Sequence, residues 1–126
     1  MPSENKHYVL TVTAERDFRQ ARQWSLSRWG AELTKKYFVS LHNSAEYIAQ
    51  NHHSLDGKEH FTGTSGLGIH AVKEHYLVYV PIREGYIVIV ALIRQTRDVP
   101  AILKANNYLI RREISDICSQ FSKSRD

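Results

Sequence analysis

The sequence predicts a two-layer α+β domain in which an N-terminal helical hairpin packs on a small, mostly antiparallel sheet. Two neighbouring segments with apolar residues at helical spacing come first, and a half rich in β-branched residues follows them. The chain has 126 residues, of which 42% are apolar, so it fits a single domain over residues 1–126 with material for one core.

Composition excludes several classes of protein. Cys118 is the single cysteine, which excludes an internal disulfide framework and a thiolate zinc cluster. The longest apolar run, Ile87 to Ile93, is far shorter than the roughly 20 residues that cross a bilayer. The first residues lack the apolar core of a secretory signal, so we expect a cytoplasmic protein with no membrane partner. The net charge of +4 favours an acidic partner, either nucleic acid or an acidic polypeptide.

The first half of the chain predicts one strand and two helices. Residues 8–12 are β-branched and apolar and indicate a short buried strand. Thr13 offers an N-cap hydroxyl for a helix that ends at Gly30. Apolar residues repeat at helical spacing again from Leu33 to about Gln50. Because the break between the two helices is so short, they must fold back as an antiparallel hairpin.

Residues 51–68 predict a long loop, since four of the six glycines and three of the seven histidines fall there. The glycine cluster 63–68 lacks the lysine and hydroxyl residue of a phosphate-binding loop. The side chains of this loop that resemble a metal site are His52, His53, Asp56, Glu59 and His60. Adjacent histidines do not easily aim at one ion, so we expect solvated side chains, no metal and no cofactor.

The second half of the chain predicts three strands, at residues 69–73, 75–82 and 86–95, with a hairpin turn at Glu84–Gly85. The last strand is apolar without interruption, which indicates burial on both faces and therefore a central position. Pro81 cannot donate a ladder hydrogen bond and predicts a strand end, an edge or a bulge.

After Val99–Pro100 the sequence predicts a helical tail. Its apolar seam consists of Ile110, Ile114, Ile117 and Phe121. We expect this seam to complete the core by closing over the sheet, with docking of a target or of a second subunit as the alternative.

One group of polar side chains predicts a functional rim, because the ends of neighbouring strands can meet at one edge of a small sheet. Its members are Lys73, His75, Tyr76, Arg94, Arg97 and Asp98. A base, an acid and a guanidinium near one phosphate suit metal-independent RNA cleavage. The same rim suits binding to an acidic protein surface without chemistry, and Arg97 and Asp98 can also form a local ion pair at the strand end.

The order of these elements coincides with several short motifs. They are Val9–Ala14 leading into Asp17–Phe18, Trp29–Gly30, Tyr37, Leu41, Ala49–Asn51, His75–Tyr79, Ile93–Pro100 and Ile102–Leu103. With these motifs, the chain resembles toxins of the RelE/ParE superfamily, from bacterial type II toxin–antitoxin modules, and it is most similar to the ParE branch.

The resemblance implies a β-α-α-β-β-β core at about residues 8–103, so residues of about 104–122 form a C-terminal helical extension. It also implies a partner, a cognate antitoxin encoded in the same operon, that wraps and silences the toxin. RelE-like members cut mRNA on the ribosome. ParE-like members, which include plasmid stabilisation proteins, poison DNA gyrase and are not known as nucleases.

Departures from the RelE-like pattern favour the ParE-like activity. Tyr76 stands where RelE-like proteins usually have an arginine, and Arg94 stands where many relatives have a histidine. The lysine-rich stretch is reduced to Lys58 and Lys73, whereas the ending 97–100 has the ParE-like form. The resemblance therefore implies a growth-inhibiting protein that binds DNA gyrase and stops replication, and it favours a binder over an enzyme.

We expect the target-binding residues to be Arg94, Arg97, Asp98, Arg111 and Arg112. The first alternative is a ribosome-dependent, metal-independent endoribonuclease acting on mRNA. Its phosphate ligand would be Arg94 or Arg97, its acid His75 or Tyr76, and its nucleophile-polarising group Lys73. The second alternative is an inactive or retargeted toxin-like binding domain.

Overall fold

One mixed sheet organises the fold, with strand order β1-β4-β3-β2. The strands are β1 (Tyr8–Leu10), β2 (Gly68–Val72), β3 (His75–Arg83) and β4 (Tyr86–Arg94). β4 pairs with β3 antiparallel and with β1 parallel, and β2 pairs with β3 antiparallel. The computed structural model describes residues 7–58, 62–63 and 66–124, the last four of these by their backbone alone. The predicted α+β class and the central position of the apolar strand are confirmed.

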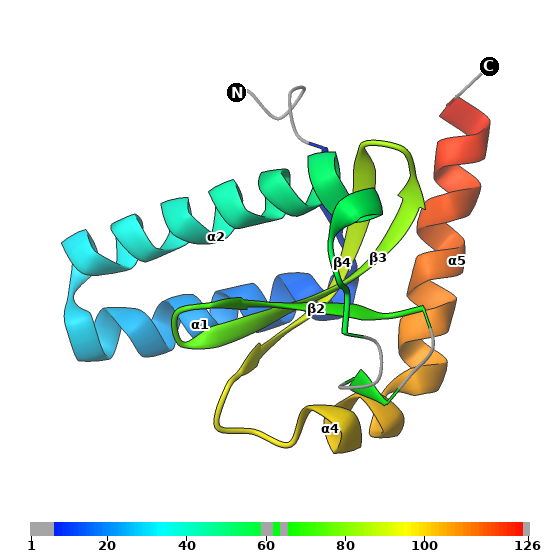
Figure 1. Ribbon diagram of the computed structural model, residues 1–126. Helices are drawn as coiled ribbons and strands as arrows, with labels where there is room; N and C mark the ends of the chain where they lie inside the picture. Colours follow the sequence, from blue (N-terminus) through cyan, green and yellow to red (C-terminus); the bar gives the residue numbers. More distant parts are fainter. Residues whose placement is uncertain (1–6, 59–61, 64–65, 125–126) are drawn as a thin grey trace.

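The predicted helical hairpin is present and covers one face of the sheet (Figure 1). It consists of α1 (Val12–Trp29) and α2 (Ala31–Asn51), which is followed by a short 3₁₀ turn, η2 (His52–Ser54). Gly30 separates the two helices with a φ of +87°, a conformation that residues with a side chain rarely adopt. The hairpin-side core contains Tyr37, Leu41, Ile48, Leu77, Tyr79, Ile87 and Ile89.

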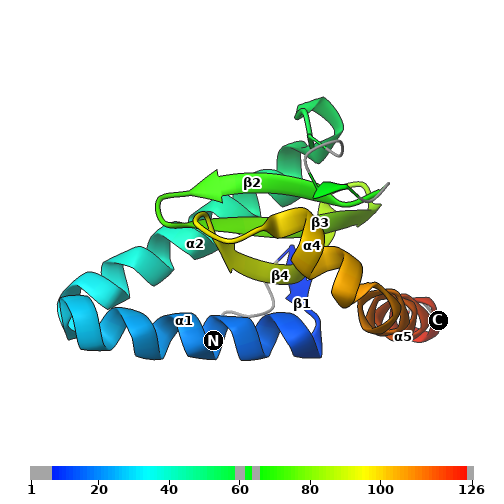
Figure 2. The same cartoon turned by 90° about the horizontal axis from the view of Figure 1, so that it is seen from below.

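The opposite face of the sheet is covered by the C-terminal tail, so this part of the fold has a third layer (Figure 2). The tail consists of α4 (Val99–Ala105) and α5 (Asn107–Ser124). The tail-side core contains Leu67, Ile69, Val78, Val88, Val90, Val99, Leu103 and Ile110. Ile114 and Ile117 of α5 pack against this cluster, as the seam predicts, whereas the side chain of Phe121 lies outside the described part of the structure.

The predicted helical tail consists of two helices, α4 and α5. Asn106 separates them, because its backbone N–H and its side-chain Nδ2 both donate to the carbonyl of Ile102, at 3.2 and 2.8 Å. A side chain that bonds to the preceding turn in this way competes with continuation of the helix. α5 then begins directly after Asn106, whose own carbonyl accepts from the Ile110 N–H.

The N-cap of α1 is Thr11 and not Thr13, so the first strand is shorter than predicted. The Thr11 hydroxyl accepts from the Ala14 N–H at 3.0 Å. The backbone N–H of Thr11 donates to the Ile89 carbonyl of β4. Thr13 lies in the first turn, where its N–H and hydroxyl both donate to the Glu113 carboxylate of α5. Both threonines have a hydroxyl that can cap a helix. Thr11 is the N-cap because its backbone pairs with β4, so the helix begins directly after it.

Pro81 lies next to a register shift in β3, which agrees with the predicted bulge. β2 pairs with β3 only as far as Tyr79, so Pro81 sits where β3 has one neighbouring strand instead of two. The loop predicted over residues 51–68 is shorter, since α2 reaches Asn51, η2 follows and β2 begins at Gly68. Within the described residues, no helix is long and apolar enough to span a bilayer.

We predict that Gly68→Ala destabilises the fold, whereas Gly57→Ala does not. A Cβ at Gly68 would lie 2.6 Å from Cζ of Tyr79, a ring that is itself buried in the hairpin-side core. Overpacking of this kind costs about 1–3 kcal/mol in the free energy of unfolding. A Cβ at Gly57 makes ordinary contacts at 3.5 Å, so this variant is the matched control. Urea unfolding of both variants is the measurement, and equal losses would contradict the packing described.

Candidate functional site

A large cleft lies where α1, the adjoining ends of β3 and β4, and α4 meet. It has a volume of about 680 Å³, and we call it the Arg94 cleft. The side chains that line it include Asp17, Ala21, Trp24, His75, Leu92, Arg94, Arg97, Ile102 and Asn106. Its walls are therefore mostly apolar, with two guanidinium groups and one carboxyl group among them.

The pairing of β3 and β4 brings the polar residues of the cleft together. His75 begins β3 and is the register partner of Arg94, which ends β4. A turn follows, in which the Arg97 N–H donates to the Arg94 carbonyl at 3.0 Å. This turn returns the chain to the cleft, so both arginines line it although β4 has ended.

Arg94 is held by an aromatic ring. Its guanidinium carbon lies 4.4 Å from the ring centroid of Trp24, within the range of a cation–π contact. The ring of Trp24 in turn meets Trp29 edge-on, at 5.4 Å between centroids. The Nε atom of Arg94 is buried and has no hydrogen-bond partner among the described residues. The site therefore contains a positioned donor that the described part of the chain does not satisfy.

His75 is buried beside Arg94 and is only 2% exposed. Its Nδ1 lies 2.7 Å from the hydroxyl of Tyr37, and that hydroxyl donates to the carbonyl of Val72 at 2.9 Å. Because the hydroxyl has one hydrogen, both bonds form together only if Nδ1 of His75 is the donor. Burial, together with the nearby Arg94 charge, lowers the pKa of His75 to about 4, so the ring is neutral at pH 7.

Two further groups of the site have shifted pKa values. Burial raises the pKa of Tyr37 to about 12, so its hydroxyl keeps its proton. Burial also raises the pKa of Asp17 above its usual value, against the opposing effect of the Leu92 N–H, which donates to its Oδ2 at 3.1 Å. Asp17 thus partners the backbone of β4 beyond the end of β1, which pairs only as far as Ile89.

The structure brings together only part of the predicted rim. His75, Arg94 and Arg97 line one cleft. Tyr76 packs against the tail-side core, on the other face of the sheet, because neighbouring residues of a strand point to opposite faces. Lys73 lies in the turn between β2 and β3, with a φ of +52°, is exposed and does not line the cleft.

The five predicted target-binding residues do not all line the Arg94 cleft, which includes Arg94 and Arg97. Asp98 and Arg111 line a second hollow of about 650 Å³, which includes Lys104 of α4. Asp98 is the N-cap of α4, where its Oδ1 accepts from the Ala101 N–H at 3.2 Å, and the local ion pair with Arg97 is not among the ion pairs of the described residues. Arg112 is exposed on α5 and lines neither hollow.

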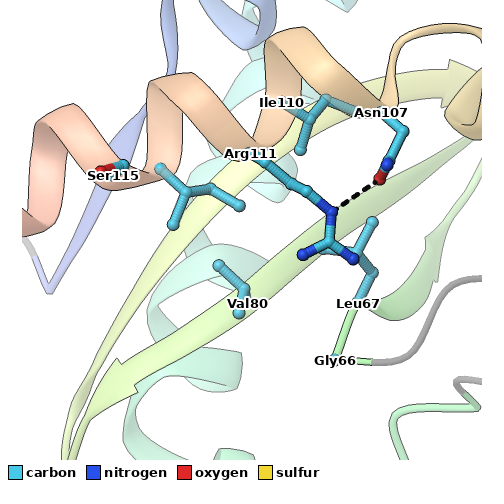
Figure 3. Close-up of a pocket in the computed structure, with 8 residues that line it drawn as sticks. Gly66, Leu67, Val80, Asn107, Ile110, Arg111 and Ser115 are labelled. Carbon is cyan, nitrogen blue, oxygen red and sulfur yellow. Dashed lines mark hydrogen bonds between the residues drawn. The ribbon is translucent and has the colours of Figure 1, made fainter.

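A third hollow lies under the tail, between α5 and the sheet (Figure 3). It has a volume of about 280 Å³, and Leu67, Val80, Ile110 and Ile114 give it an apolar lining. Arg111 borders it and donates from Nε to Asn107 at 3.2 Å. Among the described residues that line it, Arg111 is the one titratable group, and most of the remaining lining is apolar.

Residues outside the predicted rim contribute to the Arg94 cleft. Trp24 and Asp17 line the cleft but are not among the predicted site residues, and Tyr37, which contacts His75, is predicted as a helix residue and a family motif but not as a site residue. A signal for Trp24 exists in the sequence, because this large aromatic residue falls outside the regular apolar stripe of its helix.

The residues predicted to resemble a metal site are only partly described. His60 and Glu59 lie outside the described residues. Within the ranges that the structure describes, no group of three or more His, Cys, Asp or Glu side chains is arranged to hold a metal ion.

The fold and the matched sequence place the chain among the RelE/ParE superfamily toxins. The family model of the ParE toxin of type II toxin–antitoxin systems, parDE, matches residues 8–99, and the chain belongs to this family. The match ends at the first residue of α4, so the rest of the tail lies beyond it. No curated protein matches the sequence.

A solved structure has a fold similar to that of this chain. A chain of the chromosomal ParDE TA system from P. aeruginosa is 14% identical, with a TM-score of 0.59. The match covers 98% of that chain but 73% of this one. This protein therefore has structure in addition to the shared fold.

We predict that the protein loses stability as the pH falls from about 6.5 to about 4. In this window the unfolded state binds a proton at His75, whose ordinary pKa is about 6.5, whereas the folded state binds it only near pH 4. Stability therefore rises with pH through the window, by at most about 3 kcal/mol from this residue. Above pH 6.5 His75 is neutral in both the folded and the unfolded state, so the free energy of unfolding no longer changes with pH because of this residue.

The measurement is urea unfolding at pH 4.5 and 7 for the wild type, for His75→Asn and for His53→Gln. The amide introduced by His75→Asn can still donate toward Tyr37 but does not titrate, so the pH dependence should become shallower. His53 is exposed, so its variant should keep the wild-type slope. A His75→Asn protein with an unchanged slope would show that another group causes the loss.

Proposed function

We propose that this toxin inhibits DNA gyrase and blocks replication until a cognate antitoxin neutralises it. Membership of the ParE family supports a toxin of a type II module with an antitoxin partner. The choice of gyrase over mRNA rests on the Arg94 cleft, because its chemistry suits binding better than cleavage.

The observation that carries this choice is the separation of the groups that RNA cleavage would need. Tyr76 and His75 lie on opposite faces of the sheet, and Lys73 does not line the cleft. His75 is neutral at pH 7 because of its low pKa, so it is not the imidazolium that could act as an acid toward a leaving oxygen. The charged groups that remain in the cleft are two arginines and the carboxyl group of Asp17, and paired guanidinium groups bind anionic groups without chemistry.

In this proposal Arg94 and Arg97 contact an acidic surface of the target. Arg94 is fixed by Trp24, whereas Arg97 also lines the cleft and is exposed. A positioned guanidinium loses less conformational freedom on binding than a mobile one does, so Arg94 in particular is suited to protein recognition.

We predict that the purified chain inhibits supercoiling by DNA gyrase and causes cleaved DNA to accumulate. Arg97→Glu should need about a tenfold higher concentration for the same inhibition, the effect of losing one charge-assisted contact. Arg19→Glu is the matched control, because Arg19 is also an exposed arginine but does not line the cleft.

Primer extension on mRNA from expressing cells is the companion measurement, and it should show no codon-linked cuts. Cuts without inhibition of gyrase would instead support the RelE-like activity. Unchanged growth on expression, with both assays negative, would support the inactive or retargeted domain.

A further inference from the structure

We propose that the C-terminal tail binds single-stranded DNA through three cationic side chains and one tyrosine ring. We call this set the tail surface, and it consists of Lys104, Tyr108, Arg111 and Arg112. None of these residues lines the Arg94 cleft, so this site is separate from the one proposed to bind the target. The proposal rests on the proposed function only for the choice of DNA over RNA, because DNA is the substrate of gyrase.

The first observation is that two helices bring cations to one hollow. Lys104 of α4 and Arg111 of α5 are both exposed, and both line the hollow of about 650 Å³. Asn106 ends α4 directly before α5 begins, so side chains from two helices border the same space. Neither cation forms an ion pair with a carboxylate among the described residues. Their charges are therefore available to an anionic ligand.

The second observation is the orientation of Arg111. Its Nε donates to Oδ1 of Asn107 at 3.2 Å, and the two terminal nitrogens of the guanidinium lie beyond this bond (Figure 3). No described residue accepts a hydrogen bond from these terminal nitrogens. A guanidinium can donate two parallel hydrogen bonds to the oxygens of one phosphate. The bond to Asn107 therefore positions Arg111 and leaves the end that would bind a phosphate open.

The third observation is an aromatic ring that nothing in the described part of the chain covers. Tyr108 is 78% exposed, more than any other large apolar side chain of the described residues. Arg111 and Arg112 follow it by three and four residues, so the three side chains share one face of α5. Sites for single-stranded nucleic acids combine cations that follow the backbone with exposed rings on which bases stack.

The acidic side chains near the tail surface do not cancel its charge. Asp98 borders the hollow but accepts a backbone N–H as the N-cap of α4. Glu113 is turned toward α1, where it accepts two hydrogen bonds from Thr13. Asp116 is exposed one turn further along α5. Three cations therefore stand against two carboxylates, Asp98 and Asp116, on a chain whose net charge is +4, and this balance attracts a polyanion.

The combination of charge and an open ring favours a nucleic acid over an acidic protein. A nucleic acid repeats a phosphate and a flat base along one strand, so a single strand can use both kinds of contact. In the Arg94 cleft, by contrast, the ring of Trp24 already contacts a guanidinium. The family match ends at residue 99, so the tail surface belongs to the extension of this chain. In a complex with gyrase and DNA, the cleft would contact the protein and the tail surface the DNA.

The experiment is fluorescence anisotropy of a labelled oligothymidylate of about 12 nucleotides, titrated with the full chain without gyrase. We expect binding at low salt that weakens as salt is added. Three phosphate contacts predict a slope of about −2 in the plot of log K against log salt concentration. Absence of binding at low salt would overturn the proposal.

Variants of the ring test the stacking contact. Tyr108→Ala should raise the Kd about tenfold, whereas Tyr108→Phe keeps the ring and should bind as the wild type does. Tyr47→Ala is the matched control, because Tyr47 is an exposed tyrosine of α2, 51% exposed, outside the tail surface. If Tyr108→Ala binds as tightly as Tyr47→Ala, the stacking contact does not exist and the proposal fails.

Variants of the cations test the phosphate contacts. Arg111→Gln and Arg112→Gln should each weaken binding and make the salt slope shallower by about 0.7. Arg19→Gln removes an exposed arginine of α1 and should leave the slope unchanged. All these side chains are exposed, and urea unfolding of each variant checks that the fold is retained. A slope that Arg19→Gln changes as much as Arg111→Gln does would show non-specific attraction and overturn the site.

Two competitors test the class of ligand. A glutamate peptide with the same number of charges should compete less well than unlabelled oligothymidylate. Equal competition by this peptide would assign the tail surface to an acidic protein and overturn the proposal. An oligouridylate that binds more tightly than the DNA would overturn the choice of DNA.

The outcome is separable from that of the gyrase assay. A chain that inhibits gyrase but does not bind the oligonucleotide refutes this inference alone. A chain that binds the oligonucleotide through Tyr108 but leaves gyrase unaffected refutes the choice of target and leaves DNA binding by the tail standing.

Discussion

The burial of β4 on both faces is the constraint on which the rest of the structure depends. All seven residues from Ile87 to Ile93 are buried, so the sheet needs a cover on each side. The helical hairpin covers one face and the tail covers the other. Arg94 is the next residue along the strand and the first that is not fully buried, so the end of the core places a charge at the surface.

The same burial prepares the Arg94 cleft for binding. His75 is kept neutral by its low pKa and is held by Tyr37, so it adds no positive charge beside Arg94 at neutral pH. Asp17 has an internal partner in the β4 backbone, and the ring of Trp24 holds the guanidinium. Arg94 Nε is the exception, because no described residue accepts from it. A rigid site loses little conformational entropy when a partner binds to it.

Much of the fold could be predicted from the sequence because its elements follow simple periods. The helices of the hairpin repeat at helical spacing around Gly30, and the uninterrupted apolar run of β4 indicates a central strand. The site was less predictable. The alternation of side chains along a strand is enough to predict that His75 and Tyr76 lie on opposite faces of the sheet. The position of Trp24 in the cleft depends instead on how α1 crosses β4, a tertiary arrangement that no local sequence period contains. The break at Asn106 depends on a side chain that bonds to its own helix.

The C-terminal tail shows how an extension becomes part of a shared fold. The family match ends at residue 99, yet Leu103 and Ile110 beyond it are buried against the second face of the sheet. Glu113 of α5 also accepts two hydrogen bonds from Thr13 at the start of α1. Ile102 and Asn106 line the Arg94 cleft, so the tail supplies one wall of the site as well. Removing the tail would expose the tail-side core and open the cleft at once, and therefore stability and binding in this chain depend on the same helices.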